Sequence, residues 1–518
     1  MKLRATSLHP WQRGSVSGLA LICLLSASPP PASAQRVDVI DPTQNRNWAP
    51  GAIDHALKMR MFSDVGQSTQ ATPPIIPKLE VDPDPTGRVA TFTPGVATIT
   101  ANNAFFKNMG TNGRTCFTCH QPQTGWTISA ASARARFDAS AGLEPLFRSV
   151  DGATCPSDDI STLQARQEAF KLLTGKGLIR IGIKLPVPPV PLQFTVTVVQ
   201  DPYKCTSNPV TGLTSPTTGV VSMYRRPLPS TNLPFLSTIM WDGREPSLSN
   251  QSVDATLIHA QGDPNNPPTA AQQAEIVTFE TGLFTAQTFD NNADVLHADG
   301  ATGGPVALSL QKFFKGINDP INPPNPPGFF DPNIFDLYKP WLGLSGAGEA
   351  AYRLSVARGE EVFNTTKIKI TGVPGLNDLP GLPPVIDGFC GTCHDSPNVG
   401  NHSVKAPLNI GIANAGPNAP PALDISGLPV FTLECLAGPL TGNKFFVTDI
   451  DRAMITGQCA DIGKLKGPIL RGLAARAPYF HNGSAATLLD VVNFYDQRFG
   501  LNFTDQQKQD LVNFLNAL

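Results

Sequence analysis

The residues most able to do chemistry are two copies of one motif, in which two cysteines three positions apart are followed directly by a histidine. Thiols at this spacing on one turn can add to the two vinyl groups along one edge of a haem. The histidine is then held beneath the iron as its proximal ligand, and the covalent bonds retain the cofactor. The sequence therefore predicts two covalently bound haem c groups. The attachment cysteines and iron-binding histidines are Cys116, Cys119 and His120 in the first motif and Cys390, Cys393 and His394 in the second.

Two other chemistries use closely spaced cysteines, and both explain these motifs less well. A zinc ribbon would have to bring together two cysteine pairs from opposite halves of the chain, and it would leave each following histidine unexplained. A redox dithiol of the thioredoxin type would sit at the end of a βαβ unit. Two complete motifs in one exported chain favour haem.

The N-terminus has the features of an export signal. Lys2, Arg4 and Arg13 supply a positive start, residues 16–25 form a short apolar core, and residues 32–34 read Ala-Ser-Ala, a cleavage site. We therefore expect residues 1–34 to be a signal peptide and the mature protein to be periplasmic or secreted. The alternatives are an uncleaved anchor and a lipid on Cys23, which the bulky Ile22 before it disfavours.

Four further cysteines remain after the two motifs and the signal, namely Cys155, Cys205, Cys435 and Cys459. An even number in an oxidising compartment is typical of disulfides, and four cysteines allow three pairings. Each of the pairs Cys155–Cys205 and Cys435–Cys459 lies within one segment, so we favour these two bonds over four free thiols.

Composition excludes several classes of protein. The chain has 518 residues, 41% of them hydrophobic and 15% charged, with a formal net charge of −2. It has no long basic run, so no nucleic-acid surface is expected. It has no apolar run of 18 or more residues, so we expect no membrane span once the signal is removed. The chain is far longer than a simple carrier of two haems needs, so the excess must build a pocket or a substrate surface.

The pattern of elements predicts a mainly α protein, with two cytochrome c-like haem domains, long loops and a small β-hairpin insertion. Residues 178–183 and 194–199 are rich in β-branched residues and read as the two strands of that hairpin. Helices are expected at 128–141, 272–287, 346–364 and 484–496, with a last one beginning at Thr504, where Gln507 completes a capping box. The expected domains are an irregular extension at 35–103, an N-terminal haem domain at 104–332, and a C-terminal haem domain at 333–518 that begins after a Pro-rich boundary.

Two further stretches resemble the bacterial dihaem cytochrome c peroxidase superfamily, which includes the MauG-type proteins. Residues 235–244 read Phe-Leu-Ser-Thr-Ile-Met-Trp-Asp-Gly-Arg, and residues 470–484 contain Ala-Pro-Tyr-Phe-His-Asn-Gly. With both haem motifs in the same order, the resemblance runs from about residue 104 to the end, with large insertions. It implies that the N-terminal haem is the reactive one and that the C-terminal haem takes in electrons. It also implies that Trp241 relays electrons between the two, the alternative being an ordinary core tryptophan.

The resemblance also suggests the second axial ligand of the C-terminal haem. In the family this ligand lies fourteen residues after the histidine of the Ala-Pro-Tyr-Phe-His motif, which places it at Tyr495. A phenolate oxygen stabilises ferric iron more than a methionine sulfur does and lowers the potential. Tyr495 could instead be only an apolar position of its helix. His481 is the other candidate ligand, although it is more often expected to bind the cofactor through a haem propionate.

One departure from the family concerns the acid–base residue. Family peroxidases carry a glutamate about twenty residues after the tryptophan, where this chain has Gln261. His259 is the nearest titratable group and is the candidate base. The family's calcium ligand is a side-chain amide where this chain has Arg226, so calcium binding is doubtful.

The function expected from these features is a cytochrome c peroxidase-like oxidoreductase. It would take electrons from a small redox protein or another donor and would react with hydrogen peroxide or dioxygen at the N-terminal haem. The missing glutamate leaves open the oxidation of another substrate, as in MauG-type proteins and the dihaem rubber oxygenases. A non-catalytic electron-transfer cytochrome is the third alternative.

Overall fold

A computed structural model describes residues 72–321 and 330–518. The expected signal peptide at 1–34, the first part of the 35–103 extension and part of the Pro-rich boundary lie outside the described residues. Within the described residues no helix is long and apolar enough to cross a membrane.

The helices are short and are separated by long loops. Their bounds are α2 Cys116–Cys119, α3 Ala130–Ser140, α4 Leu163–Ala169, α5 Lys171–Lys176, α6 Leu248–Ile258, α7 Ala270–Thr281, α8 Pro305–Ser309, α9 Glu349–Thr365, α10 Ala453–Thr456, α11 Leu488–Phe499 and α12 Asp505–Asn516. Four of the five predicted helices are confirmed as α3, α9, α11 and α12. The fifth is correct only in part, because α7 stops at Thr281 and the chain becomes a strand at Phe284.

The expected mainly α class is wrong. The structure is 30% helical and 17% strand, and the strands form several small sheets. Their bounds are β1 Ile75–Ile76, β2 Leu79–Asp84, β3 Gly87–Phe92, β4 Thr98–Ile99, β5 Ile179–Lys184, β6 Phe194–Gln200, β7 Val220–Arg225, β8 Phe284–Asp290, β9 Asp294–Val295, β10 Ile368–Thr371, β11 Val385–Gly388, β12 Val430–Cys435 and β13 Lys444–Val447. Many are only two to six residues long, too short for their side-chain pattern to stand out in the sequence.

The predicted hairpin between 178–183 and 194–199 is also wrong, although both segments are strands. β5 pairs with β7, and β6 pairs with β12 from the other half of the chain. The inward side chains of β6, Phe194 and Val196, are buried against Phe431 and Leu433 of β12. This burial stabilises the pairing of two strands that are far apart in the sequence. No pattern within either strand could have indicated its partner.

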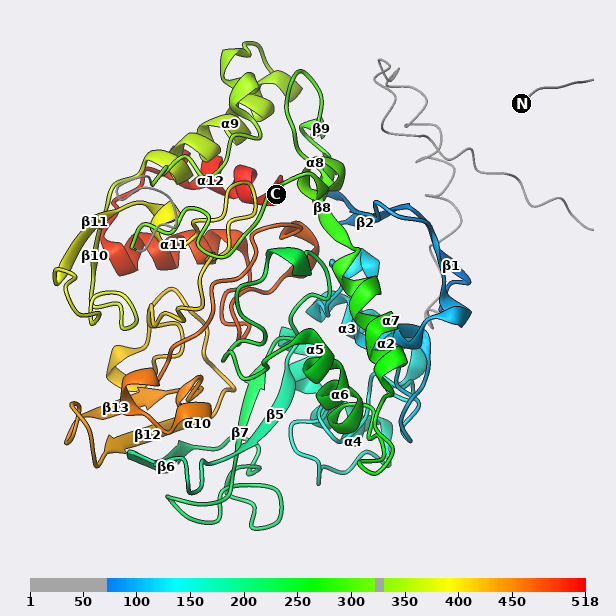
Figure 1. The fold of residues 1–518 in the computed structure, drawn as a ribbon, viewed down its shortest axis with the longest axis vertical. Helices are drawn as coiled ribbons and strands as arrows, with labels where there is room; N and C mark the ends of the chain where they lie inside the picture. The colour runs from blue at the N-terminus through cyan, green and yellow to red at the C-terminus, as the bar shows by residue number, and fades with distance from the viewer. Residues whose placement is uncertain (1–71, 322–329) are drawn as a thin grey trace, which may run out of the picture. The chain divides into compact units, whose positions relative to one another are not determined.

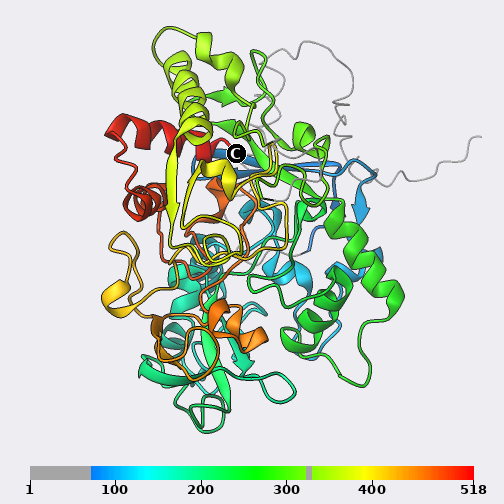
Figure 2. The same cartoon turned by 60° about the vertical axis from the view of Figure 1, so that its left-hand side comes forward.

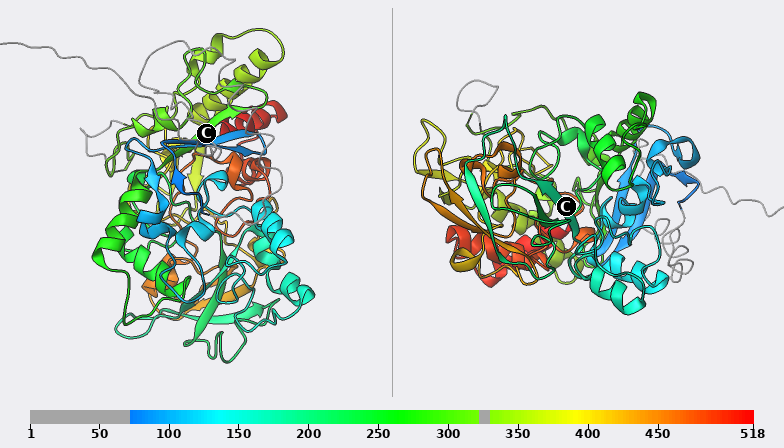
Figure 3. Two further views of the ribbon diagram at one scale, coloured as in Figure 1. Left: turned by 90° about the vertical axis from the view of Figure 1, so that its right-hand side faces the viewer. Right: turned by 90° about the horizontal axis from the view of Figure 1, so that it is seen from below.

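The described part of the N-terminal extension is not irregular. β2 and β3 form a hairpin, and β3 also pairs with β8 in a four-stranded sheet of order β2-β3-β8-β9. Thr91 of β3 accepts a hydrogen bond from Nε1 of Trp126, 2.8 Å away, just after the first haem motif. The extension therefore supports that motif, and Figure 3 shows its strands, in blue, away from the orange strands β12 and β13.

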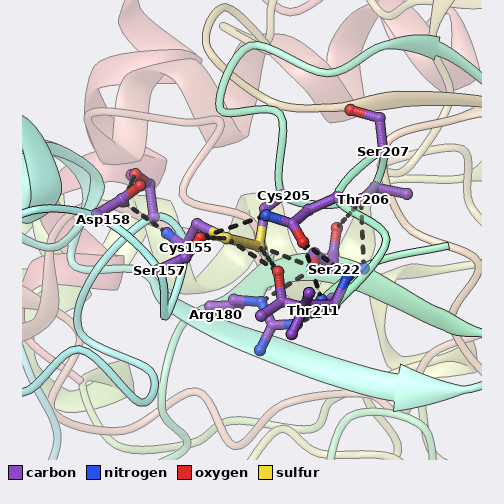
Figure 4. The surroundings of a disulfide bond; sticks show 12 residues. Cys155, Ser157, Asp158, Arg180, Cys205, Thr206, Ser207, Thr211 and Ser222 are labelled. Atoms are coloured by element: carbon purple, nitrogen blue, oxygen red, sulfur yellow. Dashed lines mark hydrogen bonds between the residues drawn. A yellow bond between two sulfur atoms is a disulfide. The ribbon is translucent and has the colours of Figure 1, made fainter.

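Both predicted disulfides, Cys155–Cys205 and Cys435–Cys459, are confirmed. The first joins the loop after α3 to the loop after β6, close to Arg180 and Ser222 on the neighbouring strands β5 and β7 (Figure 4). Arg180 Nε donates to the hydroxyl of Ser222, 2.9 Å away, so the bond lies against a hydrogen-bonded strand pair. The first disulfide therefore joins two loops beside the β5–β7 pair, and the second joins the end of β12 to a 3-10 turn that begins at Cys459.

The C-terminal helices α9, α11 and α12 lie together beside the β10–β11 hairpin (Figure 1). Their apolar faces meet in one core, where Val356 and Phe363 of α9 pack near Phe514 of α12. Gly359 allows the close approach, because a Cβ there would lie 2.0 Å from the Asp510 carbonyl oxygen. Figure 2 shows these helices on one side and the green helices α6 and α7 on the other.

Candidate functional site

The first motif is held by a short capped helix. Thr115 precedes α2, and its backbone N–H donates to the Thr118 hydroxyl, 3.0 Å away. His120 follows the helix, and its Nδ1 lies 2.8 Å from the carbonyl oxygen of Trp126. A carbonyl only accepts, so Nδ1 carries the proton and Nε2 keeps its lone pair. Burial lowers the pKa of His120 to about 4, so the ring is neutral and ready to bind a metal.

The second motif repeats this geometry in an unrelated sequence context. A turn of 3-10 helix spans Cys390–Thr392, and Nδ1 of His394 lies 2.7 Å from the Gly400 carbonyl oxygen. In both motifs the acceptor is the sixth residue after the histidine. Burial likewise lowers the pKa of His394. Each motif therefore presents an unprotonated Nε2, and the hydrogen bond from Nδ1 to the backbone carbonyl fixes the orientation of the ring.

The four motif cysteines are free thiols in the structure. Burial raises the pKa of each thiol, so none of them is a reactive thiolate before a partner binds. A search of the described residues for clusters of three or more metal-donor side chains finds none that contains a cysteine. The two cysteine pairs do not meet, which removes the zinc-ribbon alternative.

One cavity with mostly apolar walls is lined by both motifs. Its walls also include the other residues that the sequence singled out. They come from the loop before α6, the C-terminal end of α6, the loop before α11, and α11 itself. The predicted site residues that line the cavity are Cys116, Cys119, His120, Trp241, His259, Cys390, Cys393, His394, His481 and Tyr495. The tertiary structure therefore brings every predicted site residue to one space.

Trp241 lies on the wall of this cavity with its polar atom satisfied. Its Nε1 donates to the Arg226 carbonyl oxygen, 2.8 Å away, and its ring meets the edge of His481 at a centroid distance of 6.2 Å. The indole is thus fixed through its Nε1, and the residue is partly buried. Its relay role stays a prediction, since the geometry suits a relay and a core residue alike.

A fully buried arginine anchors the segment that carries Trp241. Nη1 of Arg225 donates to Asp242, 2.6 Å away, while Nε and Nη2 donate to the two oxygens of Asp449 at 2.7 and 2.8 Å. Asp242 directly follows Trp241, and Asp449 comes from the C-terminal half of the chain. The guanidinium therefore joins the halves of the molecule beside the cavity through charge-assisted bonds.

His259 is the C-terminal neighbour of α6 and is oriented by a carboxylate. Its Nδ1 lies 2.5 Å from Asp151, whose other oxygen is 2.5 Å from Nη1 of Arg114. Burial alone would raise the pKa of Asp151, but Arg114 and His259 outweigh it and hold this pKa below its usual range. The ionised carboxylate accepts from Nδ1, which leaves Nε2 of His259 as the nitrogen able to accept a proton.

Glu280 is a cavity residue that sequence reasoning missed. It is buried on α7 beside the first motif, and burial raises the pKa of its carboxyl to about 7. Ile276 lies four positions earlier and lines the same cavity, so a glutamate on the apolar face of that helix was the available signal. A carboxyl that titrates near neutrality in a cavity is a candidate acid–base group.

Three cations on the cavity wall show whether the residues fit haem; Arg226 and Lys466 are buried, and Arg476 is partly buried. Burial lowers the pKa of Arg226 to about 9, of Lys466 to about 8 and of Arg476 to about 10. Within the described part of the chain none of the three forms an ion pair with a carboxylate, and Nη1 of Arg226 has no hydrogen-bond partner. Buried cations need anionic partners. The propionates of a haem would supply them, so the donor set fits the cofactor.

Tyr495 and His481 occupy different surroundings. Tyr495 lines the same cavity as the second motif, and burial, followed by the nearby Cys393 and Cys390, raises the pKa of its phenol. The ring of His481 is fully buried, and its Nε2 lies 3.8 Å from Asp449 and 3.7 Å from Asp451. The ligand roles expected of Tyr495 and His481, and the doubtful calcium site, stay predictions.

Comparison with known proteins gives matches over parts of the chain. No family model matches. The chain is 34% identical over 139 residues to the cytochrome-c peroxidase IdrP2 of Denitromonas iodatirespirans, which is 25% of this chain and 36% of that protein. It is 39% identical over 75 residues to the cytochrome-c peroxidase IdrP1 of Pseudomonas sp. (strain SCT), which is 12% of this chain and 20% of that protein. The chain thus spans about a third or less of the length of these curated relatives.

A solved structure of a MauG-like protein associated with microbial copper homeostasis is also similar, at 18% identity and a TM-score of 0.30, over 57% of this chain and 73% of that one. Over the matched stretches the chain is similar in sequence to bacterial cytochrome-c peroxidases. The relationship predicted from the four motifs is therefore confirmed.

Proposed function

We propose that this protein is an exported dihaem c-type cytochrome that acts as a peroxidase. It would accept electrons at the C-terminal haem and use hydrogen peroxide or dioxygen at the N-terminal haem. The observation that carries the proposal is the single cavity onto which both motifs open, each with a histidine already held in its metal-binding tautomer. The named peroxidases among its relatives support the same reaction class.

The chain's own residues would divide the work as follows. The four motif cysteines would hold two haems, His120 and His394 would bind iron, and the cavity-wall cations Arg226, Lys466 and Arg476 would face the propionates. Haem iron, when bound, supplies the exchange of electrons with peroxide.

Around the first motif two side chains are suited to proton transfer. His259 would accept a proton at Nε2 while Asp151 holds its ring, and Glu280 would exchange protons near neutrality. Trp241, fixed by its bond to Arg226, would carry electrons along the cavity wall.

Two measurements on the mature protein test the proposal. Pyridine haemochrome and intact mass should show two covalent haems, and replacement of either cysteine pair by alanine should remove one. Turnover with peroxide and a reduced cytochrome c should then be measurable. Fewer than two covalent haems, or two haems without peroxide turnover, would contradict it. An N-terminus at Gln35 in the periplasmic or secreted fraction would establish export.

A second candidate activity is favoured by the missing glutamate. Gln261 cannot act as an acid–base group. His259 lies two residues earlier, and its Nδ1 contacts the carboxylate of Asp151. This substitution suits oxidation or oxygenation of another substrate, as in MauG-type proteins and rubber oxygenases. Oxygen uptake without peroxide would support that candidate. Failure of the reduced protein to bind carbon monoxide would instead indicate a non-catalytic electron carrier.

A further inference from the structure

A cluster of metal-donor side chains lies at the edge of the cavity, outside the two haem motifs. It consists of Asp449, Asp451 and His481, whose donor atoms all lie within 4.8 Å of one another. Each of the three side chains is at most 1% exposed. Among the described residues this is the one group of three or more such donors.

The donors of this cluster are short of partners. Both carboxylate oxygens of Asp451 and both ring nitrogens of His481 are buried without a hydrogen bond. Leaving such groups unpaired in a buried position is destabilising, and more so when the group is charged. The unpartnered imidazole is aimed into the cluster, because its Nε2 is the atom that lies 3.7–3.8 Å from the two carboxylates.

The spacing suits a shared ion better than a direct contact. A nitrogen–oxygen distance of 3.7 Å is too long for a hydrogen bond. Ligand atoms around a tetrahedral metal at about 2.0–2.2 Å lie about 3.3–3.6 Å from one another. The two His481–carboxylate distances therefore need to shorten by only a few tenths of an ångström to match this spacing.

The charges of the cluster also suit a cation. Asp242, Asp449 and Asp451 are three buried carboxyl groups, and one fully buried guanidinium, that of Arg225, lies among them. Arg244 contacts Asp242 from the edge but also faces Glu245, 3.8 Å away. With all three carboxyl groups ionised, a divalent cation would bring them and Arg225 to neutrality, which is the condition under which buried charges are tolerated.

The backbone holds the donors in place without the ion. The Asp451 N–H donates to Asp449, 2.8 Å away, and Asp451 itself has a left-handed backbone with a φ of 56°. The Arg226 N–H donates to the His481 carbonyl oxygen, 2.6 Å away. Arg225 and Arg226, adjacent in sequence, therefore fix both sides of the cluster.

We propose that Asp449, Asp451 and His481 bind one first-row divalent metal ion, such as zinc or manganese, separately from any haem iron. The imidazole nitrogen argues against calcium, which prefers oxygen ligands only, and two carboxylates with one imidazole suit zinc or manganese. The site lies beside Trp241, whose ring contacts His481. The inference does not rest on peroxidase activity, because the donors, their burial and their charge stand without it.

The test is the metal content of the holoprotein. Cells are grown with added zinc and manganese, the purified protein is washed with a chelator, and zinc, manganese, calcium and iron are measured against haem. We expect about one equivalent of zinc or manganese per chain. Asp451→Asn and His481→Gln should lose it, while Asp461→Asn, a partly exposed acid nearby, should keep it.

Other outcomes overturn the proposal. The proposal is wrong if the wild-type protein contains no stoichiometric zinc or manganese, or if it contains calcium instead. It is also wrong if the folded Asp451→Asn protein keeps the metal. If both variants fail to fold, the wild-type metal content still decides, together with an anomalous-scattering peak at this cluster. Because the readout is metal rather than turnover, an inactive protein that holds the ion would contradict only the proposed function.

Discussion

At the scale of single residues, the two histidines of the haem motifs show how much of a cofactor site is prepared by the chain. Each ring donates from Nδ1 to a carbonyl six residues later, and each is buried and neutral. The protein therefore does not have to reorganise these ligands when iron arrives. Trp241 and Tyr495 are equally well placed on the cavity wall, and substitution can separate their functional roles from packing.

The relay role of Trp241 predicts a specific kinetic defect. Trp241→Phe keeps an aromatic ring but removes the bond to the Arg226 carbonyl and the readily oxidised indole. We expect both haem spectra to be retained and turnover to fall at least about tenfold, a barrier increase of about 1.4 kcal/mol. Stopped-flow spectroscopy of electron transfer between the haems checks this. Unchanged turnover would make Trp241 an ordinary core residue.

Ligation by Tyr495 predicts a spectroscopic change confined to one haem. Tyr495→Phe should convert the C-terminal haem to high spin or open it to water, because the phenol oxygen is removed and the ring is kept. The native protein should lack the near-infrared band of methionine ligation, and the potential of this haem should be low. Near-infrared magnetic circular dichroism tests for the band and the spin state, and a spectroelectrochemical titration measures the potential. A bis-histidine signature in the native protein would point to His481 instead.

At the scale of elements, α9 and α12 show how a capped, amphipathic helix pair builds the C-terminal core. The predicted capping box at Thr504 and Gln507 is present, and Leu511, Phe514 and Leu515 are buried as their spacing indicates. Inside this core Glu360 accepts a hydrogen bond from the Tyr338 N–H, 2.9 Å away. Burial raises the pKa of Glu360 to about 7.

The raised pKa of Glu360 predicts a pH-dependent stability. The folded protein binds a proton between about pH 4.5 and 7 that the unfolded chain releases, so the free energy of unfolding falls as pH rises through this window. The loss reaches at most about 3 kcal/mol for this group. Glu360→Gln should flatten the profile by about 1–3 kcal/mol across the window, measured by denaturant unfolding at several pH values.

The pH profile of the unfolding free energy has to be compared between Glu360→Gln and wild type, because burial also raises the pKa of Glu280 to about 7. Only the difference between the two profiles belongs to Glu360. Parallel profiles that differ by a constant would show that Glu360 does not titrate in this range.

At the scale of the whole molecule, the buried charge network around Arg225 and the two disulfides hold together parts of the chain that are distant in sequence. Arg225 bridges Asp242 and Asp449, two hundred residues apart, at the edge of the cavity. β6 pairs with β12 nearby, and the Cys435–Cys459 bond closes the same region. The cavity therefore exists only when the two halves have joined.

Removal of Arg225 should destabilise the whole molecule. Arg225→Met leaves three buried carboxylates without their main counter-charge, which typically costs about 3–5 kcal/mol. A lower melting temperature and loss of haem from both motifs are expected, measured by calorimetry and haem absorbance. Arg498→Met serves as control, because Arg498 is partly exposed and bonds only to backbone carbonyls. Equal effects of the two substitutions would contradict a special role for Arg225.

The sequence by itself determined what depends on neighbouring residues. The motif spacing identifies the cysteines and histidines, the capping residues mark α12, and short separations favour the correct disulfides, because each of these features is set within one turn or one segment. Only the tertiary structure decided the β6–β12 pairing, the Asp151–His259 contact, the place of Glu280 and the Asp449–Asp451–His481 cluster. The physical reason is that these contacts join segments far apart in the chain, where burial and charge pairing outweigh local preference.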